Sequence, residues 1–519
     1  MKKIKKENKG KIVLFQPKVF SATRPYYGIP LALLGISRLL DKEGYEIKII
    51  EPLTHKNYQD DVLKEVKEAI CLGISALTGY SIYDGLQVAR AVKKKYPDLP
   101  IVWGGWHPSI LPGGTVQDEN VDVVVKGQGE RTFTELVNAF KKNKPLKNIL
   151  GIAYKDKNGN IIENPDRPLE SLDNFPPIPY HLVEVEKFLT PQEYGEKSLS
   201  YYTSYGCPHR CLFCVEQIVN KRRWVGLSPE KAVEEVAVLK KKYSFDSIQI
   251  IDSNFFISEE RSRKFAQGLI DKKVNIKWGS VNGRTRQMSR YSDDTWRLMK
   301  ESGLSCILIG AESGDNKTLE YMQKDITIDD TLKLTKFCAK YDIKILSSFL
   351  VGFPRTDKAG DCYGTVEKEI KSAFKLIDRM FEIYPRIRMM FALYLPYPST
   401  ALFEQSKKLG LEIPNKLEDW NEYLIAAEDA GKMKVRQKWV TEEQARRILM
   451  ASIYIFFFLD PDSFDLVTKR IKNKFIKFWL FLVFQAFKSI VVWRWRNKFF
   501  KFPVDFYVYN FLRKYSRLG

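Results

Sequence analysis

The sequence predicts an α/β protein in which two domains built on parallel β-strands precede a helical C-terminal region. Three observations support this prediction. Short β-branched runs alternate with helical patterns over residues 11–140, a proline-rich stretch at 173–182 interrupts the alternation, and a second alternation begins at residue 198. Buried strands that alternate with helices form parallel sheets. At 519 residues the chain is long enough for two or three domains.

The first alternation predicts a Rossmann-like, doubly wound parallel sheet. Its strands are KIVLF (11–15), EIKII (46–50), AICLGIS (69–75), PIVWGG (100–105) and VDVVV (121–125), and its helices lie over 29–40, near 60–70, over 83–95 and over 131–140. Such sheets bind ligands beyond the carboxyl ends of their strands. The loops there are rich in glycine and hydroxyl groups: GISALTGYS (73–81), GGWHPS (104–109) and GQGE (127–130). This indicates backbone that approaches a large, flat or phosphate-bearing ligand, although short turns that need a positive φ would also use glycine.

The linker and the second alternation follow. GIAYKDKNGNIIENP (151–165) is typical of a hairpin that turns at Asn158 and Gly159, and DNFPPIPYHL (173–182) marks a domain boundary. Six strands then alternate with helices, which predicts a partial (β/α)6 TIM-like barrel with its chemistry at the carboxyl ends of the strands. The strands are SLSYYTSYG (198–206), DSIQIID (246–252), IKWGSVN (276–282), CILIGAES (306–313), IKILSSFLVGFP (343–354) and IRMMFALYLPYP (387–398). The helices lie over 229–242, 259–271, 293–302, 329–341 and 364–384, with one more beginning near residue 401.

We place the domain boundaries by these patterns. The first domain covers residues 10–145, a hairpin and proline-rich linker covers 146–195, the barrel covers 196–412, and a basic, aromatic-rich helical region covers 413–519.

The net charge of +21 is concentrated at the C-terminal end, where residues 469–519 hold thirteen Lys and Arg against one acid, Asp505. The runs FWLFLVFQAF (478–487) and SIVVWRWRNKFFKF (489–502) mix aromatics with cations. The longest uncharged runs, which include ILMASIYIFFFL (448–459), fall short of the roughly 20 residues that span a bilayer. We therefore expect peripheral membrane contact through 469–519, with a packed helical domain that has a basic outer face as the alternative. Nucleic-acid binding is not expected, because large aliphatic side chains do not serve a phosphate groove.

The cysteine count indicates a reducing compartment. Seven cysteines, three of them crowded together, do not form an extracellular disulfide framework. The basic N-terminus MKKIKKENKGK is followed by IVLF, which is too short for the apolar core of a signal peptide. These features predict a cytoplasmic protein, with contact at the inner face of the cell membrane through the C-terminal region.

Cys207, Cys211 and Cys214 lie within eight residues directly after the first barrel strand. Structural zinc needs four protein ligands. The other four cysteines do not occur in Cys-x-x-Cys pairs, and His209 lies inside the same short loop, where closure around one ion would be cramped. Three thiolates suit a 4Fe–4S cluster that leaves one iron open for a substrate or cofactor. Cys71, Cys306 and Cys338 are expected to be small core residues.

The motifs together give a resemblance to a known family. Cys-x3-Cys-x2-Cys with Phe213 before its last cysteine, IIDSNFF (250–256), IGAESG (309–314), FLVGFPRTD (349–357) and YPST (397–400) resemble the radical S-adenosylmethionine superfamily. RPYYGIPLALLGISRLL (24–40), GISALT, GGWHPS and GQGE resemble the cobalamin-binding domain fused to many of its enzymes. The chain therefore resembles the radical S-adenosylmethionine enzymes that contain a cobalamin (B12)-binding domain.

This resemblance implies three cofactors and their residues. Cys207, Cys211 and Cys214 would hold the 4Fe–4S cluster. Phe213, Asp252, Glu312, Val351 and Gly352 would contact S-adenosylmethionine, with the capping of the next helix as the alternative role for Asp252. Ser75, Thr78, Gly104, Gly105, His107, Gly127, Gly129 and Glu130 would contact cobalamin.

One motif of other cobalamin proteins is absent. The Asp-x-His-x-x-Gly motif, whose histidine replaces the cofactor's own lower ligand, does not follow the first strand, where the chain reads FQPKVFSATRPYYG (15–28). We therefore expect His107 to lie beside the cofactor tail or to be a packing or surface histidine, and not to be the lower ligand.

The resemblance also implies an activity. The enzyme would cleave S-adenosylmethionine to a 5′-deoxyadenosyl radical with electrons from an external ferredoxin or flavodoxin, and would methylate an unactivated carbon of a hydrophobic substrate such as a lipid, polyprenoid or tetrapyrrole. No catalytic acid or base is assigned. The alternatives are a radical oxidative cyclase, of the kind that closes the magnesium-protoporphyrin ring anaerobically, and a non-enzymatic metal-binding protein with a basic membrane- or nucleic-acid-binding tail.

Overall fold

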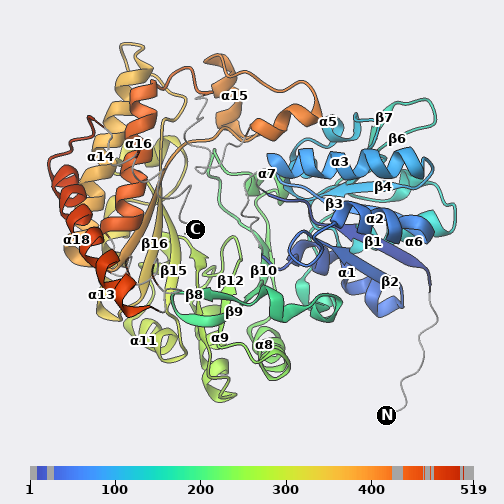
Figure 1. The fold of residues 1–519 in the computed structure, drawn as a ribbon, viewed down its shortest axis with the longest axis horizontal. Helices are drawn as coiled ribbons and strands as arrows, with labels where there is room; N and C mark the ends of the chain where they lie inside the picture. Colours follow the sequence, from blue (N-terminus) through green and yellow to red (C-terminus); the bar gives the residue numbers. More distant parts are fainter. Residues whose placement is uncertain are drawn as a thin grey trace.

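The computed structural model describes residues 9–19, 28–423, 436–459 and 473–502, together with positions 461, 464, 468 and 507. The loop after the first strand, including RPYY (24–27), and residues 469–472 and 508–519 of the basic C-terminal segment therefore lie outside the described residues. Two α/β domains lie side by side, with the N-terminal domain at one end of the molecule and the barrel at the other (Figure 1). The predicted α/β class is confirmed.

The N-terminal domain has one seven-stranded sheet in the order β2-β1-β3-β4-β5-β6-β7. Its first five strands are parallel: β1 (Lys11–Phe15), β2 (Glu46–Ile50), β3 (Ala69–Ser75), β4 (Ile101–Gly104) and β5 (Val123–Val125). Helices α1 (Leu31–Glu43) and α6 (Glu130–Lys141) pack on one another, as do α2 (Tyr58–Glu65) and α3 (Tyr80–Lys95). The doubly wound sheet is confirmed.

The hairpin expected in the linker is part of this sheet. Strand β6 (Ile152–Lys155) pairs antiparallel with β5, and β7 (Ile161–Glu163) pairs antiparallel with β6. Ile152 and Ala153, which point to opposite faces of β6, are both fully buried, so the hairpin belongs to the core of this domain.

The barrel contains six parallel strand positions. They are β9 (Gly195–Tyr201), β12 (Ser247–Ile250), β13 (Lys277–Gly279) continued by β14 (Val281–Gly283), β15 (Cys306–Glu312), β16 (Lys344–Val351) and β17 (Ile387–Leu393). The third position is interrupted at Ser280, whose φ of 51° is left-handed, and the wall therefore divides into two four-stranded sheets. A bridge between Trp278 and Leu304 crosses the division. The predicted partial barrel is confirmed.

The outer helices of the barrel lie where the sequence places them, within a few residues at each end. They are α8 (Pro229–Tyr243), α9 (Glu259–Asp271), α11 (Asp293–Glu301), α13 (Ile328–Lys340), α14 (Cys362–Ile383) and α15 (Ala401–Lys408). Three short elements that the sequence did not indicate surround the loops at the strand ends: α4 (Trp106–Ile110), α7 (Glu216–Val219) and β11 (Trp224–Gly226). The predicted strand 198–206 is divided, since β9 ends at Tyr201 and Ser204–Gly206 form β10, which pairs antiparallel with β11. Elements of three to five residues are too short to show a periodicity.

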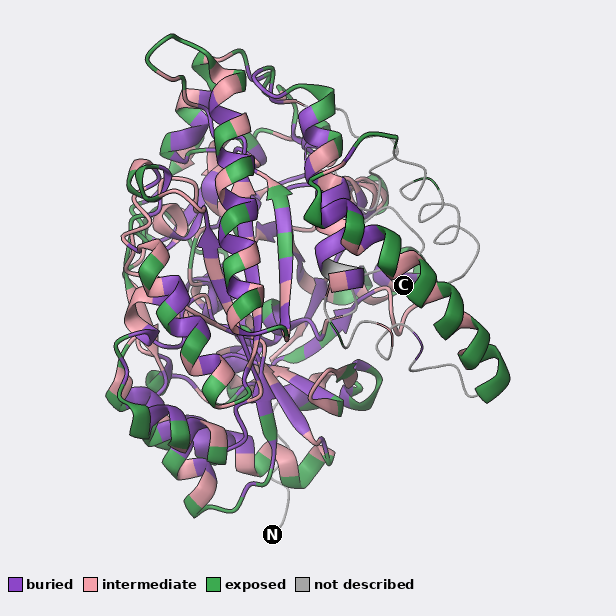
Figure 2. Cartoon of the chain, turned by 90° about the vertical axis from the view of Figure 1, so that its left-hand side faces the viewer, coloured by how far each residue is buried: buried purple, intermediate pink, exposed green. Residues whose placement is uncertain are grey.

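The C-terminal region packs two helices on the barrel. Helix α16 (Glu442–Tyr454) contacts α14 and β17, and α18 (Lys474–Arg496) contacts α16 and the π-helical turn Ile455–Leu459. Figure 2 shows that most of α18 is exposed and that one end projects beyond the body. By length and composition alone α18 is long and apolar enough to cross a membrane. Its uncharged runs remain shorter than the roughly 20 residues named above, because basic residues interrupt them, and the helix meets this criterion by its average hydropathy.

Candidate cofactor and substrate site

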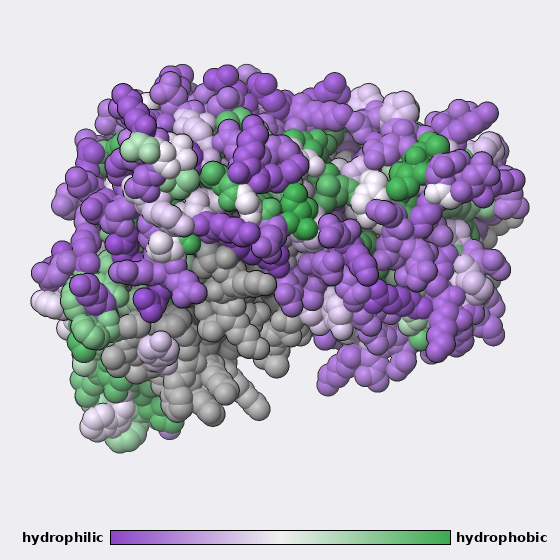
Figure 3. Space-filling model, turned by 90° about the horizontal axis from the view of Figure 1, so that it is seen from above, coloured by the Kyte–Doolittle hydropathy of each residue, from purple (hydrophilic) through white to green (hydrophobic). Residues whose placement is uncertain are grey.

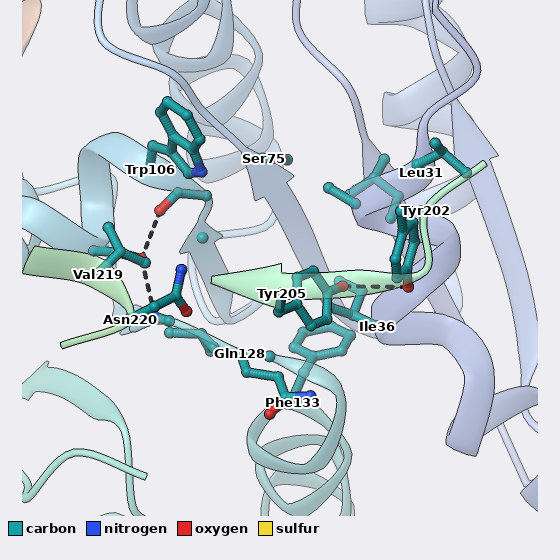
Figure 4. A pocket seen from close by; sticks show the side chains of 18 of the residues that line it. Leu31, Ile36, Ser75, Trp106, Gln128, Phe133, Tyr202, Tyr205, Val219 and Asn220 are labelled. Carbon is teal, nitrogen blue, oxygen red and sulfur yellow. Dashed lines mark hydrogen bonds between the residues drawn. The ribbon is translucent and has the colours of Figure 1, made fainter. Parts of the chain in front are cut away.

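A cavity of about 1280 Å³, its open mouth included, lies between the two domains. Ser75, Gly104 and Gly127, at the carboxyl ends of β3, β4 and β5, line one side of it. Tyr205 and Ile251, which follow β9 and β12, line the other side. Figure 4 shows side chains from both domains directed toward this space. The ligand-binding edges of the two sheets therefore face each other across one cavity.

The structure separates the eight predicted cobalamin residues into two groups. Ser75, Gly104, Gly105, Gly127 and Gly129 line the cavity. Thr78, His107 and Glu130 do not line it and are buried behind its wall. The loops that line it were thus identified by sequence, although three of the side chains chosen in them point elsewhere.

Gly105 is one position where the cavity wall requires glycine. Its φ is +99°, and a Cβ there would lie 2.6 Å from the carbonyl oxygen of Ala76 in the loop after β3. The neighbouring Gly104 has no such constraint, since its Cβ would meet its nearest atom, the carbonyl oxygen of Val125, at 3.7 Å. Gly105 therefore allows the loops after β3 and β4 to lie in contact.

We expect Gly105→Ala to lower the free energy of unfolding by about 2 kcal/mol or more, because a left-handed φ and a clash with backbone combine. Gly104→Ala is the matched control and is expected to change the stability by less than about 1 kcal/mol. Urea unfolding followed by tryptophan fluorescence measures both. Equal effects of the two substitutions would contradict this account of Gly105.

A charged cluster lies beneath the cavity floor. The Tyr205 hydroxyl donates to Glu130 Oε1 at 3.0 Å and lies 3.2 Å from the Tyr202 hydroxyl, and Figure 4 shows this tyrosine pair at the cavity. The Arg38 guanidinium lies 5.2 Å from the centre of the Tyr202 ring. Burial raises the pKa of Glu130, and the charge of Arg38 opposes the rise. Among the described residues, neither the Arg38 nitrogens nor Glu130 Oε2 has a hydrogen-bond partner. The cluster therefore has hydrogen-bond donors and an acceptor available beside the cavity.

Sequence reasoning missed Arg38, Tyr202 and Tyr205. Two signals were available. Arg38 is a cation within the apolar run LLGISRLL, and the two tyrosines belong to the run YYTSY directly before the cysteines. Their meeting could not be inferred, because Arg38 comes from α1 and the tyrosines come from the barrel.

His107 is a buried packing residue with 1% of its surface exposed. Its Nδ1 lies 3.1 Å from the Thr78 hydroxyl, and its ring centre lies 5.3 Å from that of Trp420. Trp420 belongs to the 3-10 helix η6 (Leu417–Glu422), which returns from the barrel to pack on α3. Arg90 of α3 forms a bidentate pair with Glu418 of η6, at 3.0 and 2.7 Å. The histidine thus contributes to a contact between the N-terminal domain and the C-terminal region.

Burial lowers the pKa of His107 to about 3. In the unfolded chain a histidine has a pKa of about 6.5. Below that pH the unfolded chain binds a proton that the folded protein does not, so the folded state loses stability as the pH falls from about 6.5 toward 3. We expect His107→Phe to reduce the loss of stability between pH 7 and pH 5 by about 2 kcal/mol. Urea unfolding at the two pH values measures it, with the half-exposed His181→Phe as control. Identical pH dependence in His107→Phe and the unsubstituted protein would contradict this interpretation.

The cysteine loop lies between β10 and α7. Cys211 is buried and Cys207 and Cys214 are partly exposed. Burial raises the pKa of Cys207, and raises that of Cys214 to about 12. Across the described ranges, no three His, Cys, Asp or Glu side chains converge closely enough to hold a single metal ion. The loop supplies three thiols, which leaves one iron of a four-iron cluster without a protein ligand. It is compatible with a 4Fe–4S cluster, because each cysteine then binds a different iron and the sulfurs need not meet at one point.

Two buried cations accompany the cysteines. Arg284 Nη1 donates to Cys211 Sγ at 3.7 Å. Lys324 Nζ lies 2.9 Å from Glu312 Oε1 and 5.7 Å from the centre of the Phe213 ring. Positive charge next to a thiol favours the thiolate, the form in which cysteine binds metal. The chemistry of this loop therefore fits an iron–sulfur cluster.

Four of the predicted S-adenosylmethionine residues lie close together around these groups. Glu312 has a left-handed φ of 59°, and its carboxylate also accepts from the Ser348 hydroxyl at 3.1 Å. The ring of Phe213 lies 6.3 Å from that of Phe353, which follows Val351 and Gly352 at the end of β16. A strained acidic residue, a cation and two aromatic rings thus meet beside the cysteine loop.

Asp252, the fifth predicted residue, lies apart from them. It is buried and accepts from the backbone N–H and hydroxyl of Thr203 and from the Ser204 hydroxyl, at 2.6, 2.5 and 2.6 Å. The alternative role of helix cap was wrong, because Ser258 caps α9. Asp252 instead holds the strand that leads into the cysteine loop.

Comparison with known proteins agrees with this geometry. A family model described as B12 binding domain matches residues 17–137, and one described as Radical SAM superfamily matches residues 201–360. An uncharacterized methyltransferase from Pyrococcus horikoshii is 29% identical over 457 residues, which cover 87% of this chain and 93% of that protein. The anaerobic magnesium-protoporphyrin IX monomethyl ester cyclase of Rubrivivax gelatinosus is 23% identical over 384 residues, 72% of this chain and 66% of that protein.

Two solved structures share the fold. The cobalamin-dependent S-adenosylmethionine radical enzyme OxsB, with aqua-cobalamin and S-adenosylmethionine bound, gives a TM-score of 0.70 at 17% identity over 98% of this chain and 75% of that chain. The radical S-adenosylmethionine methyltransferase TsrM from Kitasatospora setae gives 0.60 at 17% identity over 77% of this chain and 75% of that chain.

These findings confirm that the chain is an enzyme, and the non-enzymatic alternative was wrong. The two matched domains together account for three cofactors, which are cobalamin, a 4Fe–4S cluster and S-adenosylmethionine. The chain belongs to the radical S-adenosylmethionine enzymes that carry a B12-binding domain.

Proposed function

We propose that this enzyme is a methyltransferase that acts on an unactivated carbon of a hydrophobic substrate, such as a lipid, a polyprenoid or a tetrapyrrole. The interdomain cavity is the observation that supports the proposal. One wall consists of glycine-rich loops that let a flat ligand approach the backbone, and much of the remaining lining is apolar, including Leu31, Ile36, Phe133 and Ile251.

The chain's own residues have distinct roles in this proposal. Ser75, Gly104, Gly105, Gly127 and Gly129 form the wall for the corrin. The three cysteines hold the cluster, and Phe213, Glu312, Val351 and Gly352 surround S-adenosylmethionine. When bound, these cofactors supply an electron to a sulfonium and a methyl group to the substrate. The two domains hold the bound groups on opposite sides of one space and exclude water from it.

The names of the relatives support methyl transfer over ring formation. The relative that covers most of this chain is called a methyltransferase, and so is the cytidylyl-2-hydroxyethylphosphonate methyltransferase of Streptomyces wedmorensis, 25% identical over 66% of this chain and 73% of that protein. The cyclases among the relatives make oxidative ring closure the second candidate.

Anaerobic reconstitution with iron, sulfide and hydroxocobalamin tests the proposal. We expect one corrin per chain and a brown protein that loses its colour in air. Incubation with S-adenosylmethionine, a one-electron reductant and a membrane lipid extract should then yield S-adenosylhomocysteine together with 5′-deoxyadenosine. 5′-Deoxyadenosine without S-adenosylhomocysteine would favour the cyclase, and failure to bind corrin would contradict both candidates.

We further propose that the enzyme works in the cytoplasm with an external reductant of the ferredoxin or flavodoxin class. All seven cysteines are free in the structure, as a reducing compartment requires. The net charge of +21 would attract an acidic electron donor by long-range electrostatics.

A further inference from the structure

Helix α18 has one packed face and one free apolar face. The packed face rests on the barrel through Phe484, whose ring lies 5.4 Å from that of Phe458, and through Trp495, whose ring lies 4.8 Å from that of Phe374. The Trp495 indole also donates to Asp378 Oδ1 at 2.7 Å. These contacts fix the helix on the body along one side.

The opposite face is exposed and hydrophobic. Phe475, Phe478, Trp479, Val483, Ile490 and Trp493 each have at least half of their surface exposed. Their spacing of three, four and seven residues places them on neighbouring positions of one side of the helix. Figure 3 shows hydrophobic surface gathered at the corner of the molecule where α18 projects. Large apolar side chains gathered on one exposed helix face mark a site of interaction.

The charges around this face specify its partner. Residues 469–519 carry a net charge of +12, and Lys474 and Arg496 of α18 lie beside the exposed apolar face. Aromatic rings and cations on one helix are the combination that binds at the headgroup level of an anionic bilayer. A second copy of the chain would bring two strongly cationic segments together, which charge repulsion opposes.

The packed face excludes a transmembrane path. Val491 is fully buried and Trp495 is 4% exposed against the barrel, so the last turns of α18 cannot be surrounded by lipid while the helix stays on the body. The free face can enter the bilayer surface without any change in the fold.

We propose that α18 lies in the surface of an anionic lipid bilayer, with its free apolar face in the lipid and its cations at the headgroups. The helix would thereby place the whole enzyme on the membrane. This docking does not depend on the reaction that the enzyme catalyses.

Sedimentation of the full chain with lipid vesicles tests the proposal. We expect binding to vesicles of equal parts phosphatidylglycerol and phosphatidylcholine, and little binding to phosphatidylcholine alone. Phe475→Ser combined with Trp479→Ser should weaken binding about a hundredfold, because two large exposed rings no longer enter the lipid. The control is Val238→Ser, which changes an apolar residue of α8 with 57% of its surface exposed.

A second set of variants tests whether binding requires the cations of α18. Lys474→Gln and Arg496→Gln together should weaken binding about thirtyfold, since each cation near an anionic surface contributes about 1 kcal/mol to affinity. The control carries the same change of charge elsewhere, with Lys333→Gln and Lys336→Gln on α13. Melting temperatures and cleavage of S-adenosylmethionine in solution should stay unchanged in all variants, which separates loss of docking from misfolding and from a failure of the proposed reaction.

Three outcomes would overturn the proposal. The first is equal binding to neutral vesicles, or no binding to either kind. The second is a dimer in solution that dissociates when Phe475 and Trp479 are replaced, since a second copy would then cover the face. The third is resistance of the bound protein to extraction by alkaline carbonate, which would indicate that α18 spans the bilayer.

Discussion

Cys211→Ala is expected to abolish the iron–sulfur cluster and to reduce the cleavage of S-adenosylmethionine by more than about a hundredfold. Loss of groups that merely support a metal ligand costs about 10–100-fold, and Cys211 would be a ligand itself. It is the most buried cysteine of the loop and the one that accepts from Arg284 at 3.7 Å. Without its sulfur the cluster would have two protein ligands, and the buried guanidinium would keep only its pairing with Asp325 at 3.5 Å.

Iron and sulfide content, the visible absorption of anaerobic protein and the yield of 5′-deoxyadenosine measure this effect. Cys362→Ala is the matched control, because Cys362 is a partly exposed free cysteine at the start of α14, outside the loop. It should retain cluster and turnover. A Cys211→Ala protein that keeps both would refute the assignment of the cysteine loop.

Asp252→Ala is expected to lower the free energy of unfolding by about 3–5 kcal/mol, because it removes a buried carboxylate that accepts three hydrogen bonds and balances the buried charge of Arg261. Asp252 accepts three hydrogen bonds from Thr203 and Ser204. Burial raises the pKa of Asp252 and lowers that of Arg261, while their mutual attraction opposes both shifts. Alanine would leave the buried Arg261 charge without its counter-ion and three donors without an acceptor.

Urea unfolding of the protein before reconstitution, followed by near-ultraviolet circular dichroism, measures this change. Asp252→Asn is the conservative variant, which keeps an acceptor oxygen at the same place and should lose less stability than alanine. A cost of less than about 1 kcal/mol for Asp252→Ala would show that solvent or another group replaces the carboxylate.

The fold could be predicted from the sequence where elements are long and periodic. Helix α9 spans Glu259–Asp271, as its apolar spacing indicates. The β6–β7 hairpin shows the limit of local sequence patterns. Its turn at Asn158 and Gly159 could be predicted, but its pairing with β5 could not, because that pairing depends on a contact across the sheet. Helix α18 could not be recognised as one element from runs of uncharged residues, because its lysines divide a helix that packing on the barrel keeps continuous.

The candidate site was predictable at the level of loops and less so at the level of side chains. Glycines such as Gly105 could be predicted because the loop backbone requires them, and the cysteines could be predicted because their spacing is typical of a cluster-binding loop. The contacts of Arg38 with Tyr202, and of Lys324 with Glu312, join elements whose separation in sequence conceals them. Thr78 was expected at the ligand and is turned into the protein, and His107 has the packing role that was its stated alternative, because the orientation of a loop residue depends on the neighbour that it packs against.

The return of η6 to α3 has a consequence for biosynthesis. Arg90 and its partner Glu418 are 328 residues apart, so the ribosome completes the N-terminal domain long before the segment that fastens it to the remainder is made. The barrel loop that carries Tyr205 is made before that segment and already contacts Glu130. The contact between η6 and α3 can therefore form only after both walls of the cavity have been synthesised.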